Sequence, residues 1–149
     1  MAGESPLKTF EDPSHFKLFM MDTGMLSTSF GVPPQSIINA SVQSENFRGA
    51  LAENFVMQQI HASNTQLWYW GKSGRAEVDF VMEDEQGNVV PIEVKSSDNA
   101  RSRSLSIFME KYPVPYAVRV SMKNFGLHNG IKNVPLYAAH CIKGNPVLF

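Results

Sequence analysis

The stretch AEVDFVMEDEQGNVVPIEVK, residues 76–95, decides the fold of this 149-residue chain. Two runs, residues 76–83 and 89–96, alternate apolar and polar side chains with the period of a β-strand. The intervening EDEQGN is rich in turn residues and contains Gly87. The stretch therefore predicts a β-hairpin, and the charged residues inside its strands need an explanation.

Alternation sorts the side chains of this hairpin onto two faces. One face is expected to carry the apolar residues Val78, Phe80, Met82, Ile92 and Val94. Asp79 is then expected on the other face, beside Glu93 and Lys95 of the second strand. The Cα atoms of Glu93 and Lys95 are expected about 7 Å apart along one face. This spacing suits one side chain holding a metal and the other reaching a substrate bound to that metal.

A solvated outer face explains the same pattern, because antiparallel sheets commonly expose a polar face to water. Both interpretations of Asp79, Glu93 and Lys95 remain open at this point. Pro91 lacks an N–H to donate, so its strand is expected to be an edge strand or to carry a bulge there.

A helix is predicted before the hairpin, over residues 45–62, with Ser44 as its N-cap. Its apolar residues lie almost all around the helical wheel, which indicates contacts on several sides. Glu53 falls within this apolar surface, where a carboxylate is costly unless it is paired or bound to a metal. The alternative is that Glu53 is exposed on a narrow polar strip.

The remaining segments complete an alternation of helices and strands. Strands are expected at 16–22, 67–71, 115–121 and 134–142, a short helix capped by Asp22, a helix over 101–112, and loops at 31–36 and 121–134. This order predicts an α/β fold with a mixed β-sheet flanked by α-helices.

The composition is that of one globular domain. The formal net charge is −1, so the overall charge does not indicate a nucleic-acid partner. A single Cys141 excludes an internal disulfide and suits a reducing compartment. No apolar run approaches the length of a membrane span, so a cytoplasmic protein without membrane contact is expected. Residues 1–15 read as a flexible or vector-derived tail, and residues 16–149 as one domain.

Four blocks of the sequence resemble a known family: KLFMMDTGML, GALAENFVMQQI, YWGKSGRAEVDFVM and PIEVKSS. Together they are similar to the uncharacterised domain that ends many predicted prokaryotic AAA-type ATPases. The resemblance covers about residues 16–120. It implies a C-terminal fragment of a longer protein, normally preceded by an ATPase module and a winged-helix segment.

Glu53, Asp79 and the Glu93-x-Lys95 pair also resemble the signature of restriction-endonuclease-like PD-(D/E)xK nucleases. This resemblance implies a restriction-endonuclease-like core that cleaves phosphodiester bonds, with DNA as a possible partner and Mg²⁺ or Mn²⁺ as cofactor. Asp79, Glu93 and the backbone carbonyl of Val94 would hold the metal. Lys95 would stabilise charge on the phosphate, and Glu53 would bind through water or hold a second metal.

Arg101 and Arg103, at the start of the following helix, could touch a DNA backbone, although a solvated surface position is the favoured interpretation of both. The segment GKS at 71–73 lacks the glycine that a phosphate-binding loop needs at position 66, so no ATP site is expected in this chain. The alternative to a nuclease is a non-catalytic regulatory or docking module that keeps the nuclease fold. In that module, Asp79, Glu93 and Lys95 would stabilise one another without metal.

Overall fold

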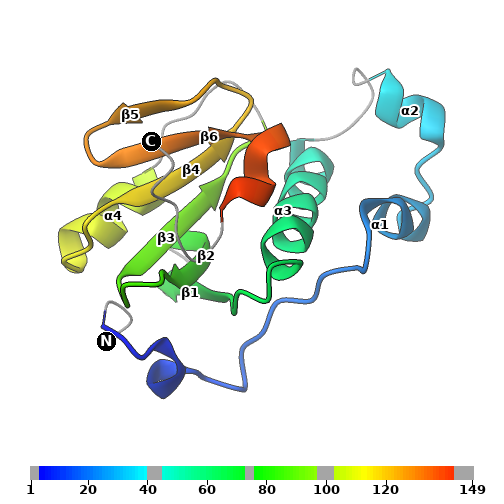
Figure 1. Cartoon of the computed structure of the whole chain (residues 1–149). Helices are drawn as coiled ribbons and strands as arrows, with labels where there is room; N and C mark the ends of the chain where they lie inside the picture. The colour runs from blue at the N-terminus through cyan, green and yellow to red at the C-terminus, as the bar shows by residue number, and fades with distance from the viewer. Residues whose placement is uncertain (1–3, 40–44, 73–75, 97–102, 143–149) are drawn as a thin grey trace.

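The computed structural model describes residues 4–39, 45–72, 76–96 and 103–142 and shows one mixed sheet with helices on both faces (Figure 1). The predicted α/β class, a mixed sheet flanked by helices, is confirmed. In chain order the elements are η1 (Leu7–Phe10), α1 (Thr23–Ser29), α2 (Pro34–Ile38), α3 (Glu45–His61), β1 (Trp68–Lys72), β2 (Ala76–Glu83), β3 (Val89–Val94), α4 (Arg103–Lys111), β4 (Ala117–Ser121), β5 (Gly126–His128), β6 (Ile131–Pro135) and η2 (Leu136–Cys141).

The sheet has the strand order β1-β2-β3-β4-β6-β5. Strands β1, β2 and β3 pair antiparallel, β4 joins β3 in parallel, β6 joins β4 in parallel, and β5 closes the far edge antiparallel to β6. The predicted hairpin is confirmed, with Phe80 paired to Ile92 and Glu83 to Val89. Gly87 has a positive φ of 78° in its turn, a conformation that glycine adopts without strain.

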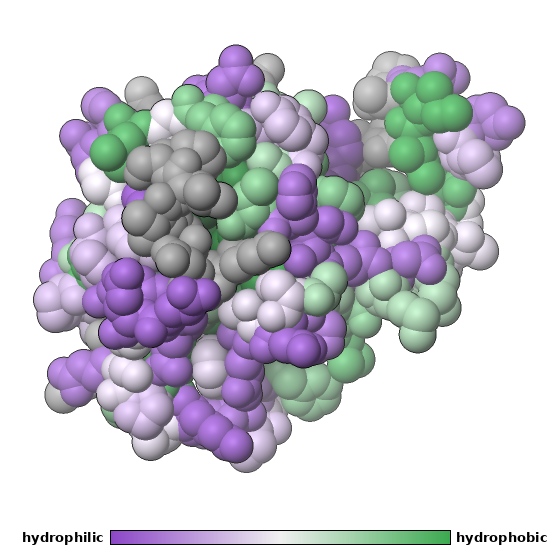
Figure 2. Space-filling view, in the orientation of Figure 1, coloured by the Kyte–Doolittle hydropathy of each residue, from purple (hydrophilic) through white to green (hydrophobic). Residues whose placement is uncertain are grey.

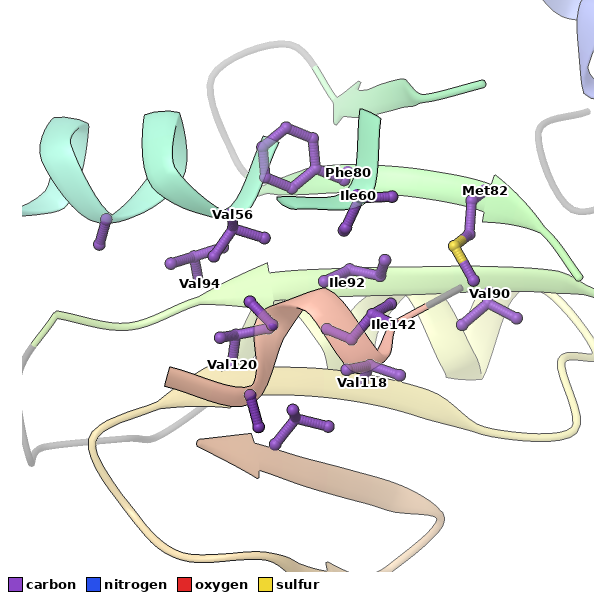
Figure 3. Packing of buried hydrophobic residues seen from close by; sticks show 14 residues of the cluster. Val56, Ile60, Phe80, Met82, Val90, Ile92, Val94, Val118, Val120 and Ile142 are labelled. Carbon is purple, nitrogen blue, oxygen red and sulfur yellow. The ribbon is translucent and has the colours of Figure 1, made fainter. Parts of the chain in front are cut away.

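One face of the sheet packs against α3 and η2 (Figure 3). The fully buried side chains of this α3-side core come from the helix and from the central strands, and include Val56, Ile60, Phe80, Met82, Ile92, Val118 and Ile142. Branched side chains fill the central strands because both of their faces are covered.

The opposite face packs against α4. Its core, the α4-side core, contains Leu7, Trp70, Val78, Val81, Leu105, Phe108, Tyr112 and neighbours. Trp70 meets the ring of Phe108 edge-on at 5.4 Å, and its indole N–H donates to the hydroxyl of Tyr112 at 3.3 Å. Trp70 therefore belongs to the core, as its place in the predicted strand indicates.

Strand β2 contains a β-bulge that the alternation rule did not anticipate. Trp70 pairs with Val78 and Trp68 pairs with Val81, so β2 has one extra residue between its two partners. Across the bulge the side chains change face: Val78 lies in the α4-side core, whereas Phe80 lies in the α3-side core. The expected common face for Val78 and Phe80 is wrong for this reason.

Pro91 lies in a central strand, which corrects the expectation of an edge strand or a local bulge. The N–H of Val94 points toward β2 and that of Lys95 donates to Val120 O on β4 at 2.8 Å. Alternation then directs the nitrogen of Pro91 toward β4. The ladder to β4 begins only at Ile92, so no hydrogen bond is lost.

The segment 16–22, expected as a buried strand, is an extended arm outside the sheet. Asn54 of α3 holds its backbone: Met20 N–H donates to Asn54 Oδ1 at 2.8 Å, and Asn54 Nδ2 donates to Met20 O at 3.2 Å. Much of the arm is exposed, with Leu18 86% accessible. The short apolar run in this segment was misleading, because the backbone of the arm forms hydrogen bonds with a helix side chain and not with a strand.

Helices α1 and α2 extend beyond α3 on the side away from β1 (Figure 1), and apolar side chains gather on their surface (Figure 2). The predicted cap of α1 is confirmed, since Asp22 Oδ1 accepts from Met25 N–H at 2.7 Å. The expected loop 31–36 is partly wrong, because α2 begins at Pro34. Ser44, the expected cap of α3, lies outside the described residues.

The C-terminal third differs most from expectation. The expected loop 121–134 contains the β5–β6 hairpin. Of the expected strand 134–142, only the first two residues lie in a strand, the end of β6, and η2 begins at Leu136. Cys141 therefore lies in a 3₁₀ helix, partly buried against the α3-side core.

Within the expected N-terminal tail, one described residue, Leu7, is anchored to the domain. Leu7 is buried in the α4-side core, and its N–H donates to Glu83 Oε1 at 2.7 Å. Among the helices of the described ranges, none combines the length and the apolar character needed to cross a membrane.

Candidate functional site

The candidate site forms where β2 and β3 separate. Their ladder ends at the pair Phe80–Ile92. Beyond it, Val94 N–H donates to the side chain of Asp79, at 2.7 Å from Oδ2, instead of to the backbone of β2. The Asp79 carboxylate therefore lies in the gap between the strands, at the bulge of β2.

Glu93 is the most buried acid of the site, at 3% exposure. Its Oε1 forms an ion pair of 2.9 Å with Lys95 Nζ. Its Oε2 is buried and has no hydrogen-bond partner among the described residues. Buried polar atoms normally have partners, so this oxygen is available for a cation or a water.

Glu53 approaches from α3, on the face of Ile92 and Val94, whereas alternation directs Glu93 to the opposite side of β3. The four acidic and basic residues singled out in the sequence thus do not share one face. They meet at the strand ends, where Lys95 acts electrostatically on Glu53, and Glu53 and Glu93 both act on Asp79.

Two residues that the sequence did not single out complete the charge cluster. Lys17 Nζ forms an ion pair with Glu77 Oε1 and lies 3.8 Å from Glu53 Oε2. It also lies 5.4 Å from the centre of the Tyr69 ring. A lysine inside the apolar run FKLFMM was the available signal, but the expected strand assigned it no partner.

Crowding of carboxylates changes their protonation. The pKa of Asp79 is raised to about 7. Burial is the largest cause and the charges of Glu53 and Glu93 add to it, while the hydrogen bond from Val94 N–H and the charge of Lys17 oppose it. Burial also raises the pKa of Glu53, although Lys17 opposes this effect. The cluster therefore carries more negative charge than its two lysines neutralise.

A groove of about 1380 Å³ opens beside these residues, between the N-terminal arm and the edge of the sheet formed by β1 and β2. Its wall includes Lys17, Tyr69, Glu77, Asp79, Glu93 and Lys95. Ser104, next to Arg103 at the start of α4, also lines it. Arg103 is exposed, and Arg101 lies outside the described residues.

The donor set can be tested against a divalent metal. Carboxylate oxygens of Asp79 and Glu93 with the Val94 carbonyl are hard ligands, and Mg²⁺ often binds one or two carboxylates while keeping its waters. The unpaired Glu93 Oε2 and the raised pKa of Asp79 fit a missing positive charge. No group of three or more His, Cys, Asp or Glu residues is arranged as a metal site in the described ranges. The fit is therefore to a cation with two carboxylate ligands.

Fold and site together define a mixed α/β domain with a charged groove at the ends of its central strands. The family described as "Domain of unknown function (DUF4143)" matches residues 48–139, more than half of the chain. The chain belongs to this family. Neither the curated proteins nor the solved structures contain a significant match.

Proposed function

We propose that this domain is a divalent-metal-dependent phosphodiesterase with a restriction-endonuclease-like core. The observation that carries the proposal is Glu93 Oε2, a buried carboxylate oxygen without a hydrogen-bond partner among the described residues. Its charge acts on Asp79, a carboxylate whose pKa is raised to about 7. Burying such charge is costly unless a cation compensates it.

In this proposal, Asp79, Glu93 and the Val94 carbonyl hold Mg²⁺ or Mn²⁺. The metal supplies Lewis-acid polarisation of the phosphate and a more acidic bound water. Lys95, fixed by its ion pair with Glu93, lies at the groove wall where it can neutralise charge on a phosphate. Glu53 contributes from α3 through water.

The proposed substrate is DNA, with Arg103 beside the groove, and Arg101 before it in sequence, as backbone contacts. An AAA-type ATPase module of the same full-length protein is the proposed partner. The sequence blocks that resemble the C-terminal domain of such ATPases support this association.

Cleavage of supercoiled plasmid and of single-stranded DNA, with Mg²⁺ or Mn²⁺, tests the proposal. Asp79→Ala and Lys95→Ala are each expected to lower the rate by about 100-fold or more. Glu85→Ala and Lys123→Ala remove exposed charges elsewhere and serve as matched controls. Undiminished cleavage in both site variants would identify a contaminating nuclease and reject the proposal.

One observation favours a second function, a non-catalytic regulatory or docking module. Lys95 already pairs with Glu93, and Lys17 pairs with Glu53 and Glu77, so much of the charge is balanced within the protein. Calorimetric titration with Mn²⁺ separates the two functions. If the domain is a nuclease, it should bind Mn²⁺, and Glu93→Ala should abolish this binding. If it is a docking module, it should bind no Mn²⁺.

A further inference from the structure

Lys17 occupies a cation position built from three elements. Glu53 comes from α3, Glu77 from β2 and the Tyr69 ring from β1. The Lys17 side chain is only 23% exposed although its segment is largely accessible. An ammonium group between two carboxylates and over an aromatic face is held by charge and by cation–π attraction.

The arm that carries Lys17 is fixed by the helix that carries Glu53. Asn54, the next residue on α3, is 1% exposed and makes both of its amide hydrogen bonds to Met20. One turn further along α3, Gln58 donates to Met21 O. Lys17 and Glu53 are thus positioned relative to one another by backbone anchors rather than by their ion pair alone.

The charge balance of the site suits one divalent ion beside Lys17. Four carboxylates and two ammonium groups form the cluster: Glu53, Glu77, Asp79, Glu93, Lys17 and Lys95. When all are ionised, an excess of two negative charges remains. A single Mg²⁺ or Mn²⁺ on the Asp79–Glu93 side balances that excess. A second divalent ion would leave a surplus of two positive charges, but a surplus of only one if Lys17 were removed.

We propose that Lys17 is a built-in cation that takes the place of a second metal ion, so that this domain works with one divalent ion. The inference rests on the proposed metal site and deepens it. Lys17 acts as a positioning residue, because it holds Glu53 and Glu77 and does not itself touch the reacting atoms.

Lysine is suited to this role because it stays charged. Burial lowers the pKa of Lys17, but the hydrogen bond to Glu77 and the charges of Glu53, Glu77 and Asp79 outweigh burial and raise it. The ammonium group therefore stays charged across the neutral pH range.

The stoichiometry of Mn²⁺ binding, measured by calorimetry at neutral pH, tests the inference without an activity assay. We expect one ion for the unchanged domain and for Lys17→Arg, which keeps the charge. Lys17→Met leaves Glu53 and Glu77 without a cation and is expected to bind two ions. Lys8→Met removes an exposed lysine of η1, outside the arm, and this variant should still bind one ion.

The double variant Lys17→Met with Glu53→Gln should return to one ion, which assigns the second ion to Glu53. If Lys17→Met is not folded by circular dichroism, Lys17→Gln provides the same loss of charge with a polar side chain. The inference would be overturned if the unchanged domain bound two ions. It would also be overturned if the unchanged domain and Lys17→Met bound the same number of ions, including none.

The outcomes also separate this inference from the proposed function. No ion on the unchanged domain overturns both the inference and the metal site at Asp79 and Glu93. One ion on both the unchanged domain and Lys17→Met, with DNA cleavage by the unchanged domain, overturns the inference alone. Binding of one and then two ions without any DNA cleavage supports the inference and rejects only the nuclease.

Discussion

At the scale of single residues, the hairpin turn depends on one buried acid, Asp84. It is 7% exposed, and its carboxylate accepts from Gln86 N–H, from Asn88 N–H and Nδ2, and from the Tyr116 hydroxyl. Burial alone would raise the pKa of Asp84, but the hydrogen bonds, led by those from Asn88, outweigh it and lower the pKa. This residue ties the turn of the hairpin to the segment before β4.

Asp84→Asn should lower the free energy of unfolding by about 1–3 kcal/mol at pH 7, because it removes charged acceptors from a buried network. A folded pKa below the unfolded value of 3.8 means that this stabilisation is complete above pH 3.8 and is lost as pH falls through the folded pKa. Urea denaturation at pH 7 and near pH 2.5 measures both values.

The difference between the two proteins should therefore shrink at the lower pH. Glu85→Gln, at an exposed position of the same turn, is the control and should change little. A difference of equal size at both pH values would contradict the assignment of the effect to the Asp84 charge.

The sequence identified four site residues because each interrupts a regular pattern: Glu53 on a helix surface, and Asp79, Glu93 and Lys95 in strands. It could not identify Lys17 and Glu77 as partners. Their meeting depends on the path of the arm across α3, which local pattern does not encode.

At the scale of elements, the β5–β6 hairpin illustrates a signal that was present but not used. Asn129 and Gly130 have positive φ values of 49° and 74°, as two-residue turns of type I′ require. Asn-Gly is a strong local signal for such a hairpin. Strand β5 has only three residues, all exposed, and β6 has five residues, of which the first three are half-buried and the last two buried. Neither strand alternates in a way that indicates a strand.

Gly130→Ala should destabilise the protein by about 1–2 kcal/mol, because a side chain is strained at this φ. A Cβ would also lie 3.2 Å from Met109 Cε. Gly126→Ala is the matched control in the same hairpin, since it has open space and no positive φ. Thermal unfolding of both variants measures the difference. Equal stability of the two variants would contradict the prediction that the positive φ of Gly130 makes a side chain costly there.

The bulge in β2 shows that the register of strand pairing decides which face a side chain occupies, beyond what hydrophobic alternation predicts. Hydrophobic alternation predicts one face for Val78 and Phe80, yet one extra residue opposite β1 moves them to opposite cores. The same irregularity coincides with the separation of β2 from β3 at Asp79. The site thus owes its opening to a mismatch between neighbouring strands.

At the scale of the whole molecule, a single sheet separates two cores that share its central strands. Helix α3 covers one face and α4 the other (Figure 1). Because every central strand contributes to both cores, we expect them to unfold together in one transition.

Ile60→Val in the α3-side core should cost about 0.5–1.5 kcal/mol, and Leu105→Ala in the α4-side core about 2–5 kcal/mol. Both side chains are fully buried and lie on opposite faces of the sheet. The double variant should show the sum of the two costs within about 0.5 kcal/mol. Denaturant unfolding followed by fluorescence and by circular dichroism measures this.

Coincident transitions from the two probes would support one cooperative unit. Separate transitions, or a large coupling energy between Ile60 and Leu105, would instead mean that the two faces are not independent layers of one cooperative fold.

By itself, the sequence determined the central hairpin, helix α3, α4, β4 and the mixed α/β class. The hairpin strands, α4 and β4 follow from the period of their apolar residues, because burial on one or two sides imposes that period directly. Helix α3, whose apolar residues lie almost all around the wheel, follows instead from a long run without proline after a capping residue. It also determined which charged residues are out of place in such elements. The tertiary structure was needed for the path of the arm, for the bulge and for the meeting of Lys17 and Glu77 with Glu53. These depend on strand register and on side chains distant in sequence, where no local period exists to reveal them.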